Sequence, residues 1–243
     1  MGTSYDGSPA RVVSLVPSLT ESIVATAPEL LVGATDWCTY PADLAVPRVG
    51  GTKFPDLAAV VGLRPDLVVA NAEENRAEDI AAMRAAGVAV WVTAPATVPM
   101  ALDSLQRLLG ALGYGEPPWL REARDVWAAP APVGRRTAVV PIWRRPWMVL
   151  GRHTFAGDLL ARLGIDNLFR DDPERYPKRP IEQLRGADLV VLPDEPYAFT
   201  AADGPEAFPG IPCALVSGRH LTWYGPSLVE ARSVLAAQLE TRR

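Results

Sequence analysis

Short apolar runs alternate with stretches of helical periodicity through the first part of the chain. Residues 11–16 are a short β-branched run that predicts a buried strand, and residues 67–70 are a continuous apolar run, as in a strand of a parallel sheet covered on both faces. Residues 18–27 and 76–86 space their apolar positions as a helix does. Shorter strands are predicted at 31–35 and 88–92. Strands that alternate with helices in this way predict an α/β fold on a parallel sheet.

Two of these helices carry start signals. Ser18 stands three residues before Glu21, which is the spacing of a capping box, so we expect Ser18 to be an N-cap. Asp56 precedes the apolar residues 57–62 and is expected to cap a helix there.

A long helical stretch follows, and then the alternating pattern resumes. Leucines at positions 102, 105, 108, 109 and 112 predict a helix over 98–112, and a second helical stretch covers 119–128. Beyond it, strands are predicted at 137–142, 189–192 and 214–216, and helices at 155–163, 181–184 and 227–239. The organisation is therefore an N-terminal α/β lobe over 10–95, a linking helical region over 96–134, and a C-terminal α/β lobe over 135–240.

Charge and hydropathy exclude several classes of protein. The 24 basic and 28 acidic residues give a net charge of −4, which excludes a generally basic nucleic-acid binder. No stretch reaches the roughly 20 apolar residues that a membrane-spanning helix needs. Residues 1–10 are polar and lack the apolar segment of a secretory signal. We expect a cytoplasmic protein, or an extracytoplasmic one from which the signal has been removed.

The metal and catalytic signatures of common enzymes are missing from the sequence. Cys38 and Cys213 could form one disulfide, although two isolated thiols are the simpler interpretation. With His153 and His220 as the two histidines, a three-histidine metal site is impossible. Gly-x-Gly-x-x-Gly, the phosphate-binding Gly-Lys-Ser/Thr, Gly-x-Ser-x-Gly and His-Glu-x-x-His are all absent. We assign no catalytic residue and no metal ligand.

Aromatic and polar side chains gather in loops that follow the predicted strands. In open α/β sheets, ligands bind beyond the carboxyl ends of the strands, and flat aromatic faces suit a planar or ring-bearing ligand. The alternative is that the rings seal the loops onto the lobes, and that the carboxylates only favour a helix dipole. We expect these residues to bind the ligand: Trp37, Tyr40, Lys53, Glu73, Trp143, Trp147, Tyr197, Trp223 and Tyr224.

Several segments, in order, resemble one known family. Residues 11–21 (RVVSLVPSLTE), 49–53 (VGGTK) and 63–69 (LRPDLVV) are similar to class III periplasmic substrate-binding proteins, the group of the cobalamin and iron–siderophore receptors. Residues 142–148 (IWRRPWM), 194–197 (DEPY) and 223–225 (WYG) resemble its subgroup named helical backbone metal receptors.

The resemblance implies two Rossmann-like lobes with parallel sheets, joined by a long backbone helix. It also implies a bulky corrinoid or metal-chelate (siderophore-like) ligand in the cleft between the lobes, and delivery of that ligand to an ABC importer. No intrinsic cofactor is implied, and a corrinoid or chelated iron is the expected cargo. Members commonly carry a glutamate that docks on the permease, and this chain departs from them with Ala58.

A second hypothesis belongs to a different class of function. A cytoplasmic enzyme or sensor that has reused the binding-protein fold would act on a small molecule in the same cleft. Its acid–base candidates are Glu73, Glu74, Asp194, Glu195 and His153. Convergence of these groups on one cavity would favour the enzyme.

Overall fold

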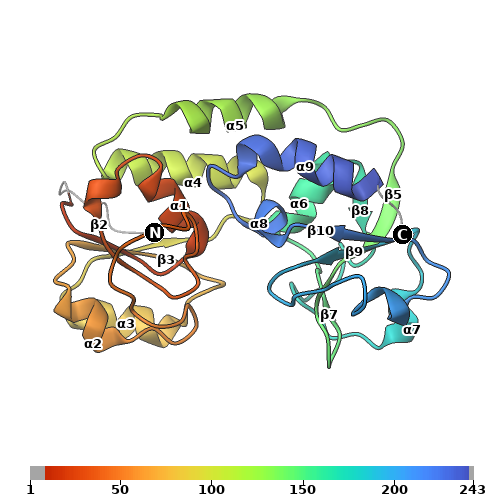
Figure 1. Ribbon diagram of the computed structural model, residues 1–243, viewed down its shortest axis with the longest axis horizontal. Helices are drawn as coiled ribbons and strands as arrows, with labels where there is room; N and C mark the ends of the chain where they lie inside the picture. Colours follow the sequence, from red (N-terminus) through yellow and green to blue (C-terminus); the bar gives the residue numbers. More distant parts are fainter. Residues whose placement is uncertain (1–8, 241–243) are drawn as a thin grey trace. The chain divides into compact units, whose positions relative to one another are not determined.

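The computed structural model describes residues 9–240 and forms two compact units (Figure 1). Of the described residues, the first comprises 9–94, Leu102–Arg121 and Tyr224–Pro226. The second comprises Pro95–Ala101, Glu122–Trp223 and 227–240. Most of the N-terminal segment in which the sequence shows no export signal, residues 1–8, lies outside the described residues.

The first unit is built on a four-stranded parallel sheet in the order β2-β1-β3-β4. The four strands cover these residues: β1 Val12–Ser14, β2 Leu31–Ala34, β3 Leu67–Asn71 and β4 Val90–Thr93. β1 and β3 are buried along their whole length, as the continuous apolar runs predicted. Because all four strands are parallel, their carboxyl ends lie at one edge of the sheet.

Helices cover both faces of this sheet. In Figure 1, α1 (Pro17–Val24) lies on one face, and α2 (Leu57–Gly62) and α3 (Ala77–Ala85) lie on the other. A short 3-10 turn, η1 (Pro28–Leu30), leads into β2.

The two capping predictions for this unit have opposite outcomes. Asp56 is confirmed as the N-cap of α2, because its side chain accepts a hydrogen bond from the Ala59 N–H (3.0 Å). Ser18 as an N-cap is wrong. The helix α1 begins one residue earlier, at Pro17, with Val16 at the N-cap and no side-chain cap. Proline suits the first helical position because it has no N–H to satisfy there.

The predicted long helix is confirmed as α4 (Val98–Ala111). Its leucines at 102, 105, 108 and 109, and Leu112 just beyond it, are all buried, as their spacing predicted. The first residues of α4 belong to the second unit and the remainder to the first, so this helix continues from one unit into the other. The second predicted stretch forms α5 (Pro118–Ala128).

The second unit contains another four-stranded parallel sheet, in the order β10-β9-β5-β8. Its strands are β5 Arg136–Val139, β8 Ile165–Asn167, β9 Leu189–Pro193 and β10 Cys213–Val216. Figure 1 shows α6 (Phe155–Arg162), α8 (Gly218–Thr222) and α9 (Leu228–Glu240) on one side of it. The fold is thus α/β with a parallel sheet in each of two lobes.

One predicted strand is divided in the structure. Residues 137–142 were expected to form a single strand, but β5 ends at Val139. Pro141 begins a separate antiparallel hairpin, made by β6 (Pro141–Trp143) and β7 (Met148–Val149). Proline has no N–H to donate to the parallel ladder, so the chain leaves the sheet at this point. Figure 1 shows the hairpin and α7 (Ile181–Leu184) on the side of the sheet opposite α9.

None of the helices within residues 9–240 is both long and apolar enough to cross a lipid bilayer.

Candidate functional site

A polar turn follows β3 at the carboxyl edge of the first sheet. We define the polar turn as residues 72–75. Asn71, the last residue of β3, accepts hydrogen bonds through its side-chain oxygen from the N–H groups of Glu73 (2.7 Å) and Glu74 (3.3 Å). Asn75 closes the turn, because its side-chain oxygen accepts from the Asn71 N–H (2.9 Å). The buried asparagines therefore fix the backbone that carries the two glutamates.

Lys53 lies beside this turn on the loop between β2 and α2. Its ammonium group donates to the backbone oxygen of Glu73, and the side-chain amide of Asn75 donates to the backbone oxygen of Thr52 (2.9 Å). Burial of the Glu74 carboxyl raises its pKa, and the Lys53 charge partly opposes that shift. The Glu73 charge adds to the raised pKa of Glu74. A cation and two carboxylates thus meet at this edge.

Tyr224 reaches the same edge from a distant part of the sequence. Its ring is 6% exposed, and its hydroxyl lies 2.6 Å from Nδ2 of Asn71 and 2.8 Å from Oγ1 of Thr93 at the end of β4. Burial raises the pKa of Tyr224 to about 12, although the hydrogen bonds to its hydroxyl oppose the shift. The structure places this predicted ligand contact inside the unit, with its hydroxyl held by protein groups.

Two predicted rings of the first unit are exposed on the loop after β2. Trp37 is 67% exposed and Tyr40 is 44% exposed. Arg48 holds this loop by donating to the backbone oxygens of Thr35 (3.0 Å) and Cys38 (2.9 Å). These two rings, unlike that of Tyr224, are exposed to solvent.

A third exposed ring in this unit was missed by the sequence analysis. Phe54 is 71% exposed, and the guanidinium of Arg76 lies 4.9 Å from its ring centroid. The Asp36 N–H donates to the Gly50 backbone oxygen (2.9 Å), which joins the loop of Trp37 to the turn before Phe54. The signal was the adjacency of Phe54 to Lys53 in a glycine-rich turn.

The second unit presents its aromatic group at the β6–β7 hairpin. Trp143 is 44% exposed and meets the Tyr197 ring edge-on, with centroids 5.6 Å apart. Tyr197 is half-buried and lies 4.6 Å from the ring of Phe199. Trp147 stacks on Phe199 at 6.1 Å and packs against the hydrophobic core of this unit. Trp143 is therefore the ring that the hairpin offers to solvent, and the others support it.

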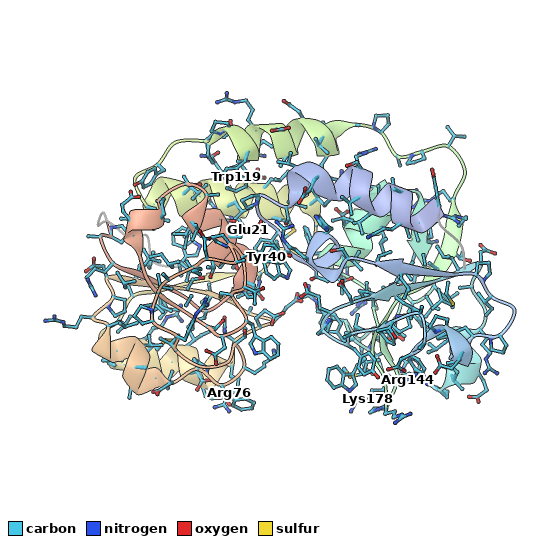
Figure 2. All side chains as sticks on the ribbon, in the orientation of Figure 1. Glu21, Tyr40, Arg76, Trp119, Arg144 and Lys178 are labelled. Atoms are coloured by element: carbon cyan, nitrogen blue, oxygen red, sulfur yellow. The ribbon has the colours of Figure 1, made fainter. Side chains whose placement is uncertain are left out.

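Arg144 connects the hairpin to the loop after β9. Its guanidinium pairs with Asp203 and with Glu206, and lies over the Trp147 ring at 5.3 Å (Arg144 is labelled in Figure 2). Asp203 also accepts a hydrogen bond from the Tyr197 hydroxyl (2.6 Å). This network holds the Tyr197 ring against Trp143.

The loop after β10 carries Trp223, the last of the predicted rings. Trp223 is 8% exposed and directly follows α8, so it lies within the second unit. In α8, His220 lies 2.8 Å from the Ser217 hydroxyl and 3.0 Å from the Glu230 carboxylate. These contacts attach the short helix to α9.

The acid–base candidates of the enzyme hypothesis have separate structural roles. Glu73 and Glu74 belong to the first unit, and Asp194, Glu195 and His153 to the second. Asp194 accepts a hydrogen bond from the Gly218 N–H (2.6 Å), and His153 is exposed in a turn. Nothing in this arrangement favours the enzyme.

Both cysteines are buried free thiols, as the simpler interpretation of the sequence held. Thr20 donates to the Cys38 sulfur (3.0 Å), and burial raises the pKa of this thiol. Among residues 9–240, no group of three or more His, Cys, Asp or Glu side chains could hold a metal ion.

The comparisons with known proteins agree on one fold. No protein-family model matches the chain. A vitamin B12-binding protein of Vibrio cholerae serotype O1 is 23% identical over 185 residues, which cover 72% of this chain and 66% of the relative, just under two thirds of its length. The crystal structure of the periplasmic vitamin B12-binding protein BtuF of Vibrio cholerae matches with a TM-score of 0.76 and 18% identity, over 96% of this chain and 97% of that one.

A second solved structure with the same fold is that of a protein named for a different ligand. The periplasmic heme-binding protein RhuT from Roseiflexus sp. RS-1 matches with a TM-score of 0.75 and 22% identity, over 94% of this chain and 97% of that one. Together with the two parallel sheets and the helix α4, these matches confirm the resemblance in the sequence: the chain has the fold of the class III periplasmic substrate-binding proteins.

Proposed function

We propose that this protein is a non-enzymatic binding protein for a bulky, ring-bearing ligand of the corrinoid or metal-chelate type. The observation that carries the proposal is the exposure of Trp37 and Tyr40 on the loop after β2 and of Trp143 in the β6–β7 hairpin, in a fold shared with B12- and heme-binding proteins. A ligand that stacks on these rings would remove their apolar surface from water.

The two kinds of side chain at these loops have complementary tasks. Each aromatic ring contributes roughly 0.5–1.5 kcal/mol beyond the burial of its area when it stacks on a planar ligand. Lys53 adds a cation beside the polar turn, which suits carboxylate, phosphate or amide groups at the ligand's periphery. In the second unit, Tyr197 supports Trp143 through its edge-on contact, and Trp147 packs on Phe199, which lies beside Tyr197.

The ligand is proposed to bring its own metal. Neither Cys38 nor Cys213 is exposed, and no cluster of ligating side chains occurs among the described residues. A corrinoid, a heme or a ferric siderophore arrives with its coordination nearly complete, so the protein needs to recognise only its rings and edges.

We further propose an extracytoplasmic location and an ABC permease as partner. The proposal relies on the similarity to proteins that are named periplasmic. Ala58 lies exposed in the first turn of α2, so the first unit offers no carboxylate to a transporter at that position. Stimulation of a reconstituted permease's ATPase by the loaded protein tests this partner, and no stimulation by a ligand-saturated protein contradicts it.

Isothermal titration with a panel of compounds tests the proposed ligand class. The panel contains cyanocobalamin, dicyanocobinamide, hemin and a ferric hydroxamate siderophore. We expect one compound to bind with a Kd at or below micromolar, as in a largely preformed site. No binding of any of the four by a folded protein would overturn the ligand class.

Matched variants then locate the site. Trp37→Ala and Trp143→Ala should each weaken binding, because each removes an exposed ring. Trp119→Phe is the control, since Trp119 lies on α5 and donates its indole N–H to Thr26 (3.0 Å), away from the strand ends (Figure 2). Equal affinity in all three variants would contradict the placement of the site.

A further inference from the structure

We propose that Tyr224 is a positioning residue, whose buried hydroxyl fixes the amide of Asn71 and thereby the conformation of the polar turn. Asn71, Thr93, the polar turn and the segment Tyr224–Pro226 all belong to the first unit. Yet Trp223 and Ser227, which flank that segment, belong to the second. A short piece of chain thus returns to the first unit to complete the edge of its sheet.

The direction of the hydrogen bonds around Tyr224 can be worked out from the protons available. The Thr93 hydroxyl has one proton, and it donates that proton to the Ala70 backbone oxygen (3.1 Å). With that proton on Ala70, Thr93 Oγ1 accepts from the Tyr224 hydroxyl at 2.8 Å. The Ser18 side chain is a further hydrogen-bond partner of the Tyr224 hydroxyl and donates to it. The Tyr224 oxygen in turn accepts from Nδ2 of Asn71 at 2.6 Å.

The same reasoning fixes the orientation of the Asn71 amide. Its oxygen must face the polar turn, because the partners there are the backbone N–H groups of Glu73 and Glu74, which can only donate. Its nitrogen must then face Tyr224 and Thr93. The Tyr224 oxygen is thus the close acceptor that holds the amide in the orientation the turn requires.

From the turn, the network continues to Lys53. Asn75 accepts from the Asn71 N–H and donates to the Thr52 backbone oxygen (2.9 Å). Lys53 donates to the backbone oxygen of Glu73. A change at the Tyr224 hydroxyl would therefore reach the two glutamates and the cation through consecutive hydrogen bonds, which begin at the buried Asn71 and end at the exposed Lys53.

Close packing on α1 keeps Tyr224 in this position. A Cβ added at Gly225 would lie 2.8 Å from the Ser22 hydroxyl and 3.0 Å from the Ser18 backbone oxygen. The backbone of this segment thus approaches α1 more closely than a residue with a side chain allows. This contact with α1 holds the backbone beside Tyr224, and so keeps its hydroxyl within hydrogen-bond distance of Asn71.

Amide hydrogen exchange tests the proposal without any ligand. In Tyr224→Phe, the Glu73 amide should exchange about tenfold faster, the equivalent of about 1.4 kcal/mol for a weakened buried hydrogen bond. The Leu15 amide, which bonds to Val69 within the sheet, should change far less. A role in general stability alone would accelerate both amides together.

Two further variants complete the exchange experiment. Tyr114→Phe is the matched control, since it removes a hydroxyl from another tyrosine of the same unit, whose partner is Glu29. Thr93→Val removes the acceptor of the Tyr224 proton and should accelerate Glu73 exchange by a smaller factor. Glu73 exchange that stays within twofold of wild type in both Tyr224→Phe and Thr93→Val would overturn the proposal.

The consequence for binding rests on the proposed function. With cyanocobalamin and hemin as probes, Tyr224→Phe should raise the Kd of the bound probe three- to tenfold, and Tyr114→Phe should leave it unchanged. An unchanged Kd in Tyr224→Phe would overturn the link between the turn and the ligand. If neither probe binds the wild type, the proposed ligand class fails, and the exchange data still decide whether Tyr224 positions the turn.

Discussion

Gly218→Ala would test how closely the loops after β9 and β10 approach one another. The two strands pair in parallel up to Val216 and Pro193, so the residues that follow them are neighbours. A methyl group on Gly218 would lie 2.1 Å from Cγ of Glu195 and 2.9 Å from its backbone nitrogen and oxygen. Carbon atoms in ordinary contact are at least about 3.5 Å apart. The Glu195 side chain must therefore move by more than 1 Å, and its backbone in the loop after β9 must shift by a smaller amount.

The expected cost follows from this crowding. Overpacking of this kind destabilises a protein by about 1–3 kcal/mol, and here backbone atoms as well as a side chain stand in the way. The displaced loop also carries Tyr197, so the support of Trp143 should loosen and the affinity for ligand should fall. Both effects arise from one added methyl group.

Urea unfolding measures this cost against a matched glycine. Gly110 lies inside α4, and a Cβ added there meets nothing within 4 Å, so Gly110→Ala should raise the free energy of unfolding by about 0.5–1 kcal/mol. If Gly218→Ala matched Gly110→Ala in both stability and ligand affinity, the inferred close approach of the two loops would be wrong.

Three further predictions concern the first unit. Asp56→Ala should lower the free energy of unfolding by about 1 kcal/mol in urea, because Ala59 loses its cap, and Asp56→Asn should restore most of it. Glu74 has a raised pKa, so its contribution to stability is complete below the ordinary value of 4.5 and is lost as pH rises through the folded value. In urea unfolding, Glu74→Gln should thus have the same free energy of unfolding as the wild type at pH 3 and a higher one at pH 7. Equal free energies of unfolding at both pH values would contradict the raised pKa of Glu74. Phe54→Ala should weaken binding of the tightest compound of the panel several-fold by calorimetry, because it removes an exposed ring beside Lys53. An unchanged Kd would exclude Phe54 from the site.

The elements that the sequence predicted are those whose packing is periodic. The buried runs of β3 and β9 and the leucine spacing of α4 are decided by burial on one or two faces, which the sequence records directly. The β6–β7 hairpin was missed, because its strands are too short for a pattern and its start depends on Pro141. α8 was missed for the same reason of length.

The candidate site was only partly predictable. The sequence predicted that Trp37 and Trp143 follow strands. It does not distinguish an aromatic side chain that packs under a loop from one that faces solvent. The structure separates the exposed Trp37 and Trp143 from the buried Tyr224 and the packed Trp147. The hydrogen bonds between Tyr224 and Asn71 join residues 153 positions apart, and no local pattern could indicate them.

The proposed function requires that the exposed rings of Trp37, on the loop after β2, and of Trp143, in the β6–β7 hairpin, bind the ligand. Its most direct test is the Kd, by isothermal titration, of the tightest compound of the panel for the double variant Trp37→Ala with Trp143→Ala. We predict that the double variant folds and loses about 2 kcal/mol of binding free energy, close to a 30-fold weaker Kd. A double variant that binds as tightly as Trp119→Phe would contradict it.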